Sequence, residues 1–211
     1  MDRKINEIQT IQPKGLGYVL GVLVGDGSLN KHKSHFSVLL GTTDKNFANQ
    51  FSFFLKKLTD SKIQRFYSRT SKKYKGKIIH SNVVVVKAYS KNLYNYLYNF
   101  KNDTNYLQSF LETQNNEMKL YFLIGFFDSE GSVSNYKKGY FAVSLTNSNL
   151  KLLKICENIF NIFNIQISGI YSDRQYYKLM IYKKREIKRF QKLIHDKSSK
   201  FQKWEIANKI E

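Results

Sequence analysis

The chain is poor in cysteine, proline and acidic residues. Cys156 is the single cysteine, which excludes an intrachain disulfide and fits a reducing compartment. The longest apolar stretch, residues 16–24, is shorter than the ~20 residues that a membrane-spanning helix needs. The first residues also lack the apolar core of a secretion signal. We therefore expect an intracellular protein, in the cytoplasm or an organelle, with no membrane segment.

The shortage of acidic residues leaves a large positive charge. The 211 residues include 35 Lys and Arg but only 16 Asp and Glu, giving a formal net charge of +19 that both halves share. This excess is larger than the net charge of about 2 to 8 that keeps a small domain soluble. Nucleic acid is the partner that this charge favours, and an anionic membrane surface is the lesser alternative.

Two segments of the chain repeat one pattern, VLGVLVGDG at residues 19–27 and LIGFFDSEG at residues 123–131. Each is a short apolar helix candidate that ends in a carboxylate followed by glycine. Asp26 and Glu130 occupy equivalent places, 104 positions apart. Small residues one helical turn apart, which let two helix backbones approach closely, precede both carboxylates: Gly21 and Gly25, and Gly125 and Ser129.

Packing of these two helices about a twofold axis would bring Asp26 and Glu130 side by side. Two adjacent carboxylates at the negative ends of two helix dipoles attract a cation. Oxygen ligands suit hard divalent ions, so we expect Mg²⁺, with Mn²⁺ or Ca²⁺ able to occupy the site. Divalent metal ions held by two such carboxylates support phosphodiester hydrolysis.

The repetition extends beyond the two motifs. Each motif precedes an alternating strand, at residues 36–40 and 141–145, and then an amphipathic helix, a hairpin and a last helix. The first hairpin is longer by 11 residues and rich in lysine, which fits contact with phosphates or, alternatively, a solvated loop tip. The candidates for DNA contact are the outward strand residues Ser37, Leu39, Arg65, Tyr67, Arg69, Tyr140, Ala142 and Ser144 and the hairpin lysines Lys72, Lys73, Lys75 and Lys77.

The motifs and their spacing resemble the LAGLIDADG homing endonucleases in the single-chain form with two motifs. The resemblance implies an α+β fold of two pseudo-twofold-related αββαββα units, whose antiparallel sheets form a DNA-binding saddle. The expected units are residues 1–105 and 118–211, joined by a linker at 106–117. In this family the enzyme cuts both strands of a long target, pseudo-palindromic or asymmetric, and leaves short 3′ overhangs. The resemblance also implies a monomer.

The same resemblance assigns roles to named residues. Asp26 and Glu130 would be the catalytic metal ligands, and the backbone carbonyls of Gly25 and Ser129 would complete the metal shell. The basic residues that reach the site from the start of the last helix of each half would be Lys91 and Arg185, whose alternative role is that of surface charges at a helix start. The sequence departs from the motif at residue 24, where Val replaces an acid that residue 128 retains as Asp. It departs again at residues 41–42 and 146–147, where family members often carry Gln or Lys.

Two other functions fit the same scaffold. One is an intron RNA maturase, and the other is a DNA-binding regulator that does not cut. Retention of both Asp26 and Glu130 favours cleavage. The sequence therefore predicts a site-specific, metal-dependent double-strand DNA endonuclease.

Overall fold

The computed structural model describes residues 12–74, 77–137 and 140–200. The first half has the order helix, two strands, helix, two strands, helix: α1 (Pro13–Val24), β1 (Ser28–His32), β2 (His35–Thr42), α2 (Lys45–Lys56), β3 (Ile63–Tyr74), β4 (Lys77–Tyr89) and α3 (Lys91–Asn102). The second half repeats this order: α5 (Asn116–Glu130), β5 (Gly131–Lys137), β6 (Tyr140–Asn147), α6 (Leu150–Ile162), β7 (Gly169–Asp173), β8 (Tyr176–Ile181) and α7 (Lys184–Ile194). Helix α4 (Thr104–Thr113) connects the two halves. The fold is therefore α+β with two αββαββα-like units, as expected.

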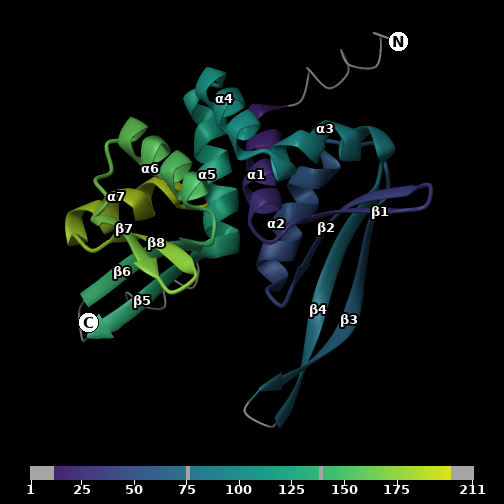
Figure 1. Cartoon of the computed structure of the whole chain (residues 1–211), viewed down its shortest axis with the longest axis horizontal. Helices are drawn as coiled ribbons and strands as arrows, with labels where there is room; N and C mark the ends of the chain where they lie inside the picture. The colour runs from purple at the N-terminus through teal and green to yellow at the C-terminus, as the bar shows by residue number, and fades with distance from the viewer. Residues whose placement is uncertain (1–11, 75–76, 138–139, 201–211) are drawn as a thin grey trace.

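Each half contains one four-stranded antiparallel sheet. The strand orders are β1-β2-β4-β3 and β5-β6-β8-β7, so the two sheets share one topology. Figure 1 shows the helices as an upper layer with the strands below them, and the long β3–β4 hairpin projecting away from the body. Its strands have 12 and 13 residues, against 5 and 6 for the β7–β8 hairpin.

Local signals in the sequence fix where the helices begin. The Asp44 carboxylate accepts hydrogen bonds from the backbone N–H groups of Asn46 and Phe47 and so caps α2, and Asn149 caps α6 by accepting from the N–H of Lys151. The two caps lie 105 positions apart, the same offset as the two strands that precede them. The duplication therefore includes capping chemistry as well as apolar spacing.

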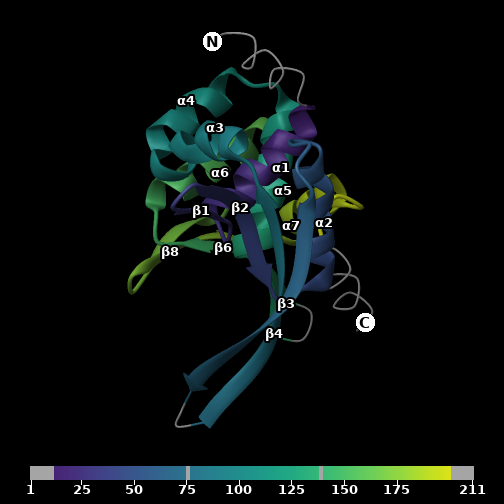
Figure 2. The same ribbon diagram turned by 90° about the vertical axis from the view of Figure 1, so that its right-hand side faces the viewer.

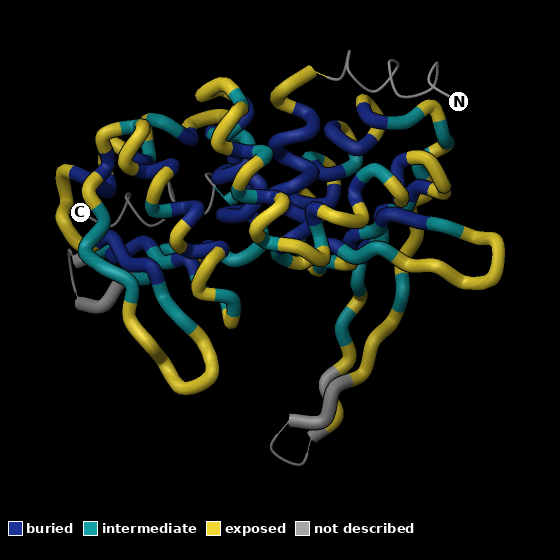
Figure 3. The backbone as a smooth tube through the Cα atoms, turned by 45° about the horizontal axis from the view of Figure 1, so that its top comes forward, coloured by how far each residue is buried: buried dark blue, intermediate teal, exposed yellow. Residues whose placement is uncertain are grey.

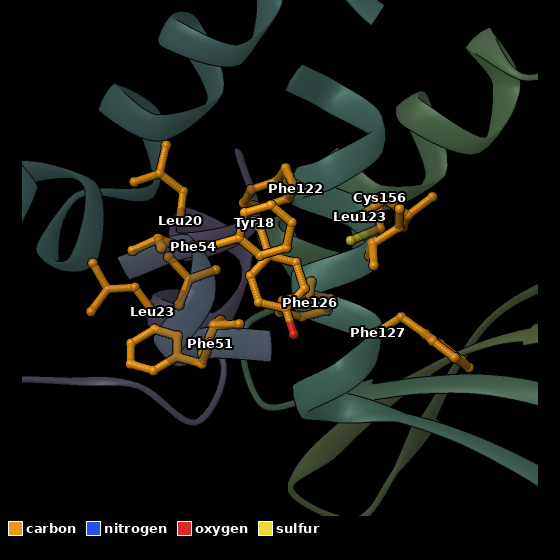
Figure 4. Close-up of a cluster of buried hydrophobic side chains, with 14 of the residues drawn as sticks. Tyr18, Leu20, Leu23, Phe51, Phe54, Phe122, Leu123, Phe126, Phe127 and Cys156 are labelled. Atoms are coloured by element: carbon orange, nitrogen blue, oxygen red, sulfur yellow. The ribbon is translucent and has the colours of Figure 1, made fainter. Parts of the chain in front are cut away.

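The core is centred on the contact between α1 and α5. Tyr18 of α1 lies beside Phe122 and Phe126 of α5, whereas Phe127 points to the other side of α5 (Figure 4). These four aromatic side chains are fully buried. Figure 3 shows the same distribution along the backbone, with buried segments in the central helices and exposed residues along the projecting hairpins. Apolar burial thus holds the two motif helices together.

No helix among the described residues is both long enough and apolar enough to cross a membrane. Cys156 is a fully buried core residue of α6, and burial raises the pKa of its thiol far above the usual range.

Candidate functional site

The ends of α1 and α5 converge because their small residues allow backbone contact. A Cβ added at Gly21 would collide with the Phe122 carbonyl, and one added at Gly125 would collide with the Tyr18 carbonyl. At Gly25, an added Cβ would lie 2.5 Å from Ser129 Cβ and 3.2 Å from the Cγ atom of Glu130. Glycine at these positions therefore permits the close approach that brings the two carboxylate-bearing helix ends together. The central position of both helices is visible in Figure 2.

Asp26 and Glu130 are close enough at these helix ends for the charge of one to affect the ionisation of the other. Partial burial raises the pKa of both carboxyl groups, and the charge of Asp26 raises the pKa of Glu130 further. The ammonium groups of Lys200 and Lys101 oppose this rise at both acids. The structure therefore brings together the two acids that the sequence repeat predicted, and it surrounds them with two lysines.

Both lysines bind backbone carbonyls at the ends of the motif helices. Lys101, in the last turn of α3, donates from Nζ to the Leu23 carbonyl at 2.6 Å. Lys200, in the turn after α7, donates from Nζ to the Phe127 carbonyl at 3.0 Å. Leu23 and Phe127 are equivalent residues of the repeat. Each half thus places one ammonium group at the end of its own motif helix, where the helix dipole favours positive charge.

The structure gives Lys91 and Arg185, the predicted basic residues, other contacts than those of Lys101 and Lys200, and their catalytic role stays a prediction. Lys91 lies ten residues before Lys101 in the same helix, roughly 15 Å away at 1.5 Å per residue, and its Nζ sits 5.5 Å from the Phe36 ring centroid. Arg185 is exposed and its Nε donates to the Glu186 carboxylate at 2.9 Å. The basic residues that act on the acid pair come from the ends of the halves: Lys101 from the last turn of α3 and Lys200 from the turn after α7.

The two halves differ around their acids. In the second half, the Asn147 amide at the end of β6 donates to Glu130 Oε1 at 3.1 Å and lowers the pKa of that carboxyl group. In the first half, the equivalent residue is Thr42, whose hydroxyl accepts from the backbone N–H of Asp44 at 3.1 Å. Lys101 differs as well, because burial lowers the pKa of its ammonium group while Glu130 and Asp26 raise it.

The acid pair has the donor chemistry of a site for a hard divalent cation. The described residues contain no group of three or more His, Cys, Asp and Glu that could hold a metal ion, so a cation here would rely on two carboxylates, backbone carbonyls and water. The mutual repulsion of Asp26 and Glu130 fits such an ion. The Ser129 carbonyl, one of the expected ligands, accepts a hydrogen bond from Lys200 Nζ at 3.1 Å and keeps a second lone pair.

The strand register corrects part of the predicted DNA-contact surface. Arg65 pairs with Val86 and Tyr67 pairs with Val84, and these valines are buried under the helices. Residues directly opposite each other share one face of a sheet. Arg65, Tyr67 and Arg69 therefore lie on the helix-side face, opposite to Leu39, and the guanidinium of Arg65 donates to Asn49 of α2.

Two further candidates lie on the open face but are covered. Ser37 is 2% exposed and Ala142 is 0% exposed. Leu39 and Ser144 stay partly accessible on that face. Lys75 lies outside the described residues, and so do the side chains of Lys72, Lys73, Lys77 and Tyr140.

The open face of the first sheet contains a group of apolar side chains among polar ones, which the sequence did not reveal. The register places Phe66 opposite Val85, and Val83, Leu39 and Lys87 lie on the same face of the sheet. Phe66 is 44% exposed, and Lys87 Nζ lies 4.4 Å from the Tyr89 ring centroid. This face therefore offers methyl groups and an aromatic ring flanked by a cation.

Comparison with known proteins gives the relatives of this scaffold. Residues 117–195 match the model of the LAGLIDADG-like domain, and residues 16–90 match that of the WhiA LAGLIDADG-like domain. Uncharacterized protein MJ0314 of Methanocaldococcus jannaschii is 33% identical over 168 residues, which cover 78% of this chain and 60% of that protein. The chain thus spans less than two thirds of the length of this relative.

Solved structures share the arrangement of both halves. The homing endonuclease I-DmoI in complex with DNA and Mn has a TM-score of 0.59 at 22% identity, covering 88% of this chain and 99% of that one. The N-terminal LAGLIDADG domain of DUF199/WhiA has a TM-score of 0.58 at 18% identity, covering 87% of this chain and 81% of that one. The fold is common to all three. The chain is a protein of two LAGLIDADG-like domains, one in each half.

Proposed function

We propose that this protein is a site-specific DNA endonuclease that hydrolyses phosphodiester bonds in both strands with the help of a divalent cation. The observation that carries this proposal is the convergence of Asp26 and Glu130 at the ends of α1 and α5. Its support is the net charge of +19 and the likeness to a homing endonuclease solved with DNA and Mn. The expected monomer, the long target and the 3′ overhangs belong to the same proposal.

The residues of the site fall into two groups, the ligands of the cation and the two lysines. Asp26 and Glu130, with the carbonyls of Gly25 and Ser129, would hold the cation, which supplies Lewis-acid activation of the phosphate and of water when bound. Lys101 and Lys200 oppose the rise that burial causes in the pKa of both acids, so their charges favour the ionised carboxylates that a cation needs. Their ammonium groups also suit the negative charge that develops on phosphate oxygens during hydrolysis.

Base contacts in the first half-site would come from the open face of its sheet. Phe66, Leu39, Val83 and Val85 suit apolar contact with the 5-methyl group of thymine in the major groove. Lys87 suits a phosphate or a purine at the same face. Tyr67 and Arg69 stay candidates for contact with the DNA backbone where the hairpin extends past the helices, whereas Arg65 donates to Asn49 of α2 and is not expected to reach a phosphate.

The cleavage test uses random-sequence duplexes selected for binding in Ca²⁺, cloned into a plasmid and incubated with Mg²⁺. We expect linear product from the native protein and a loss of at least about 100-fold with Asp26→Asn or Glu130→Gln, because each removes a charged ligand. Binding in Ca²⁺ should persist in both variants. Cleavage at the native rate by either variant would refute the assignment.

A DNA-binding protein that does not cut is the second candidate. It is favoured by the match of residues 16–90 to the WhiA domain model and by the bond from Lys200 to the Ser129 carbonyl. Selected duplexes that stay intact in Mg²⁺ and Mn²⁺ would establish this candidate. The maturase alternative stays a prediction, which splicing of a cognate intron by the purified protein would test.

A further inference from the structure

A buried carboxylate near the end of α5 takes four hydrogen bonds. Asp128 is 1% exposed, and its Oδ2 accepts from the Tyr18 hydroxyl at 2.7 Å and from the backbone N–H of Ser199 at 3.1 Å. Its Oδ1 accepts from the Ser198 hydroxyl at 2.5 Å and from the backbone N–H of Lys200 at 3.4 Å. Three of the four donors belong to the turn after α7, so Asp128 holds this turn on α5.

The turn that Asp128 holds delivers Lys200 to the acid pair. Besides the Phe127 carbonyl, Lys200 Nζ donates to the carbonyls of Ser129 at 3.1 Å and Gly131 at 2.5 Å. The backbone of Lys200 and its ammonium group are therefore both fixed on the last turn of α5. A residue that reaches its target from a turn has no helix to keep it in place, and here the buried carboxylate supplies that restraint.

The first half also holds an ammonium group at the end of its motif helix, but without a buried carboxylate. Val24 stands at the position equivalent to Asp128 and is buried. Lys101 approaches the Leu23 carbonyl from α3, a helix anchored in the core by Leu97 and Phe100. The helix thus does for Lys101 what the Asp128 hydrogen bonds do for Lys200.

We propose that Asp128 is a positioning residue that holds the Lys200 ammonium at the end of α5, beside Glu130. The consequence for DNA cleavage rests on the proposed function, whereas the placement of Lys200 does not. Loosening of the turn would then displace one of the two ammonium groups and leave the other in place. The two strands of a duplex would be cut at unequal rates.

The first experiment measures the placement of Lys200 in the metal-free protein. Acetic anhydride labels accessible amines, and mass spectrometry of peptides reports the extent at Lys200 and Lys101. We expect Asp128→Asn and Ser198→Ala to raise the labelling of Lys200 by about fivefold, the change that loss of one hydrogen bond produces, with no change at Lys101. Ser198→Ala lies outside the motif helix and carries the test should Asp128→Asn fail to fold.

The matched control is Ser199→Ala. The Ser199 hydroxyl is buried without a hydrogen-bond partner in the described part of the chain, and only the backbone N–H of this residue contacts Asp128. Labelling of Lys200 in Ser199→Ala should equal that of the native protein. Equal labelling of Lys200 in the native protein and in Ser198→Ala would overturn the proposal.

The second experiment measures cleavage of a selected plasmid under single turnover. In Ser198→Ala we expect nicked circles to accumulate, with linear product formed about tenfold more slowly and binding in Ca²⁺ unchanged, because misplacement by about 1 Å costs up to about 100-fold. Nicking and linearisation slowed equally would contradict the unequal effect on the two strands. A native protein that cuts no selected DNA would refute the proposed function, and the labelling result would still decide the role of Asp128.

Discussion

The contact between α1 and α5 makes a sharp prediction for Gly21→Ala. The added Cβ would collide with the Phe122 carbonyl and would lie 2.6 Å from the Phe126 backbone nitrogen, whereas ordinary contact begins near 3.4 Å. Both obstacles are backbone atoms, which cannot rotate away. The two helices would have to separate by about 1 Å in a core packed to crystal-like density.

The magnitude follows from two opposing effects. Overpacking costs about 1 to 3 kcal/mol, and we take the upper end because backbone atoms block the methyl group. Alanine returns about 1 kcal/mol of helix propensity relative to glycine. The net loss is about 2 kcal/mol, which lowers the melting temperature by roughly 4–8 °C for a chain of this size. Separation of the helix ends should also slow any cleavage, because Asp26 and Glu130 move apart with them.

Gly15→Ala is the matched control in the same helix. There the added Cβ would lie 3.5 Å from Leu58, an ordinary contact. Because the propensity gain is unopposed, we expect the melting temperature to rise by about 2 °C. Thermal denaturation followed by circular dichroism measures both variants. A Gly21→Ala protein as stable as Gly15→Ala would refute the close packing of α1 on α5.

Three further predictions follow from the charges and faces of the site. Asp26→Asn should raise the melting temperature in EDTA at pH 7 but not at pH 3. Burial raises the pKa of Asp26 in the folded state, so ionisation of this carboxyl group destabilises the fold once the pH exceeds the pKa of the unfolded state. At pH 3 the carboxyl group is protonated in both states, and this destabilisation is absent. An equal shift at both pH values would contradict this reasoning. Lys87→Ala should lower the salt dependence of DNA binding by about one unit of slope, whereas Arg65→Ala should leave it unchanged, because Arg65 faces α2. The opposite ranking in a salt titration would place the DNA on the other face of the sheet. Uracil in place of a contacted thymine should weaken binding by about fourfold, the value of one buried methyl group, and Phe66→Ser should abolish this difference in a competition assay.

The central helix pair could be predicted from the sequence because its requirements are local. Gly21 and Gly125 each meet a backbone carbonyl of the other helix, so both copies of the motif keep a small residue there. The alternating strands were equally visible, because residues 36–40 and 141–145 repeat one pattern 105 positions apart. The convergence of Asp26 with Glu130 followed from this repeated spacing within the chain, whereas the fold class followed from the resemblance that the motifs carry.

The buried and open faces of the first sheet could not be predicted, because apolar and polar residues do not alternate along β4. Residues 83–86 are four consecutive valines, so β4 has no alternation that tells its buried face from its open face. The pairing of β3 with β4 then decides which residues of β3 face outward, and that pairing depends on tertiary contacts. Phe66 consequently lies on the open face and Arg65 on the helix side, the reverse of the expectation.

The lysines of the site escaped prediction for a different physical reason, which also explains the asymmetry of the halves. Lys101 and Lys200 lie 99 positions apart, an offset shared with neither the motifs nor the last helices. A long, flexible side chain can reach one carbonyl from several backbone positions, so only its end point is constrained. Lys101 arrives from a helix, whereas Lys200 arrives from a turn that Asp128 restrains. Contact between the two backbones requires a small residue at the same motif position in both halves, as Gly21 and Gly125 show. A hydrogen bond from the end of a lysine side chain requires only that the ammonium group reach the carbonyl, so the two lysines stand at non-equivalent positions of the sequence.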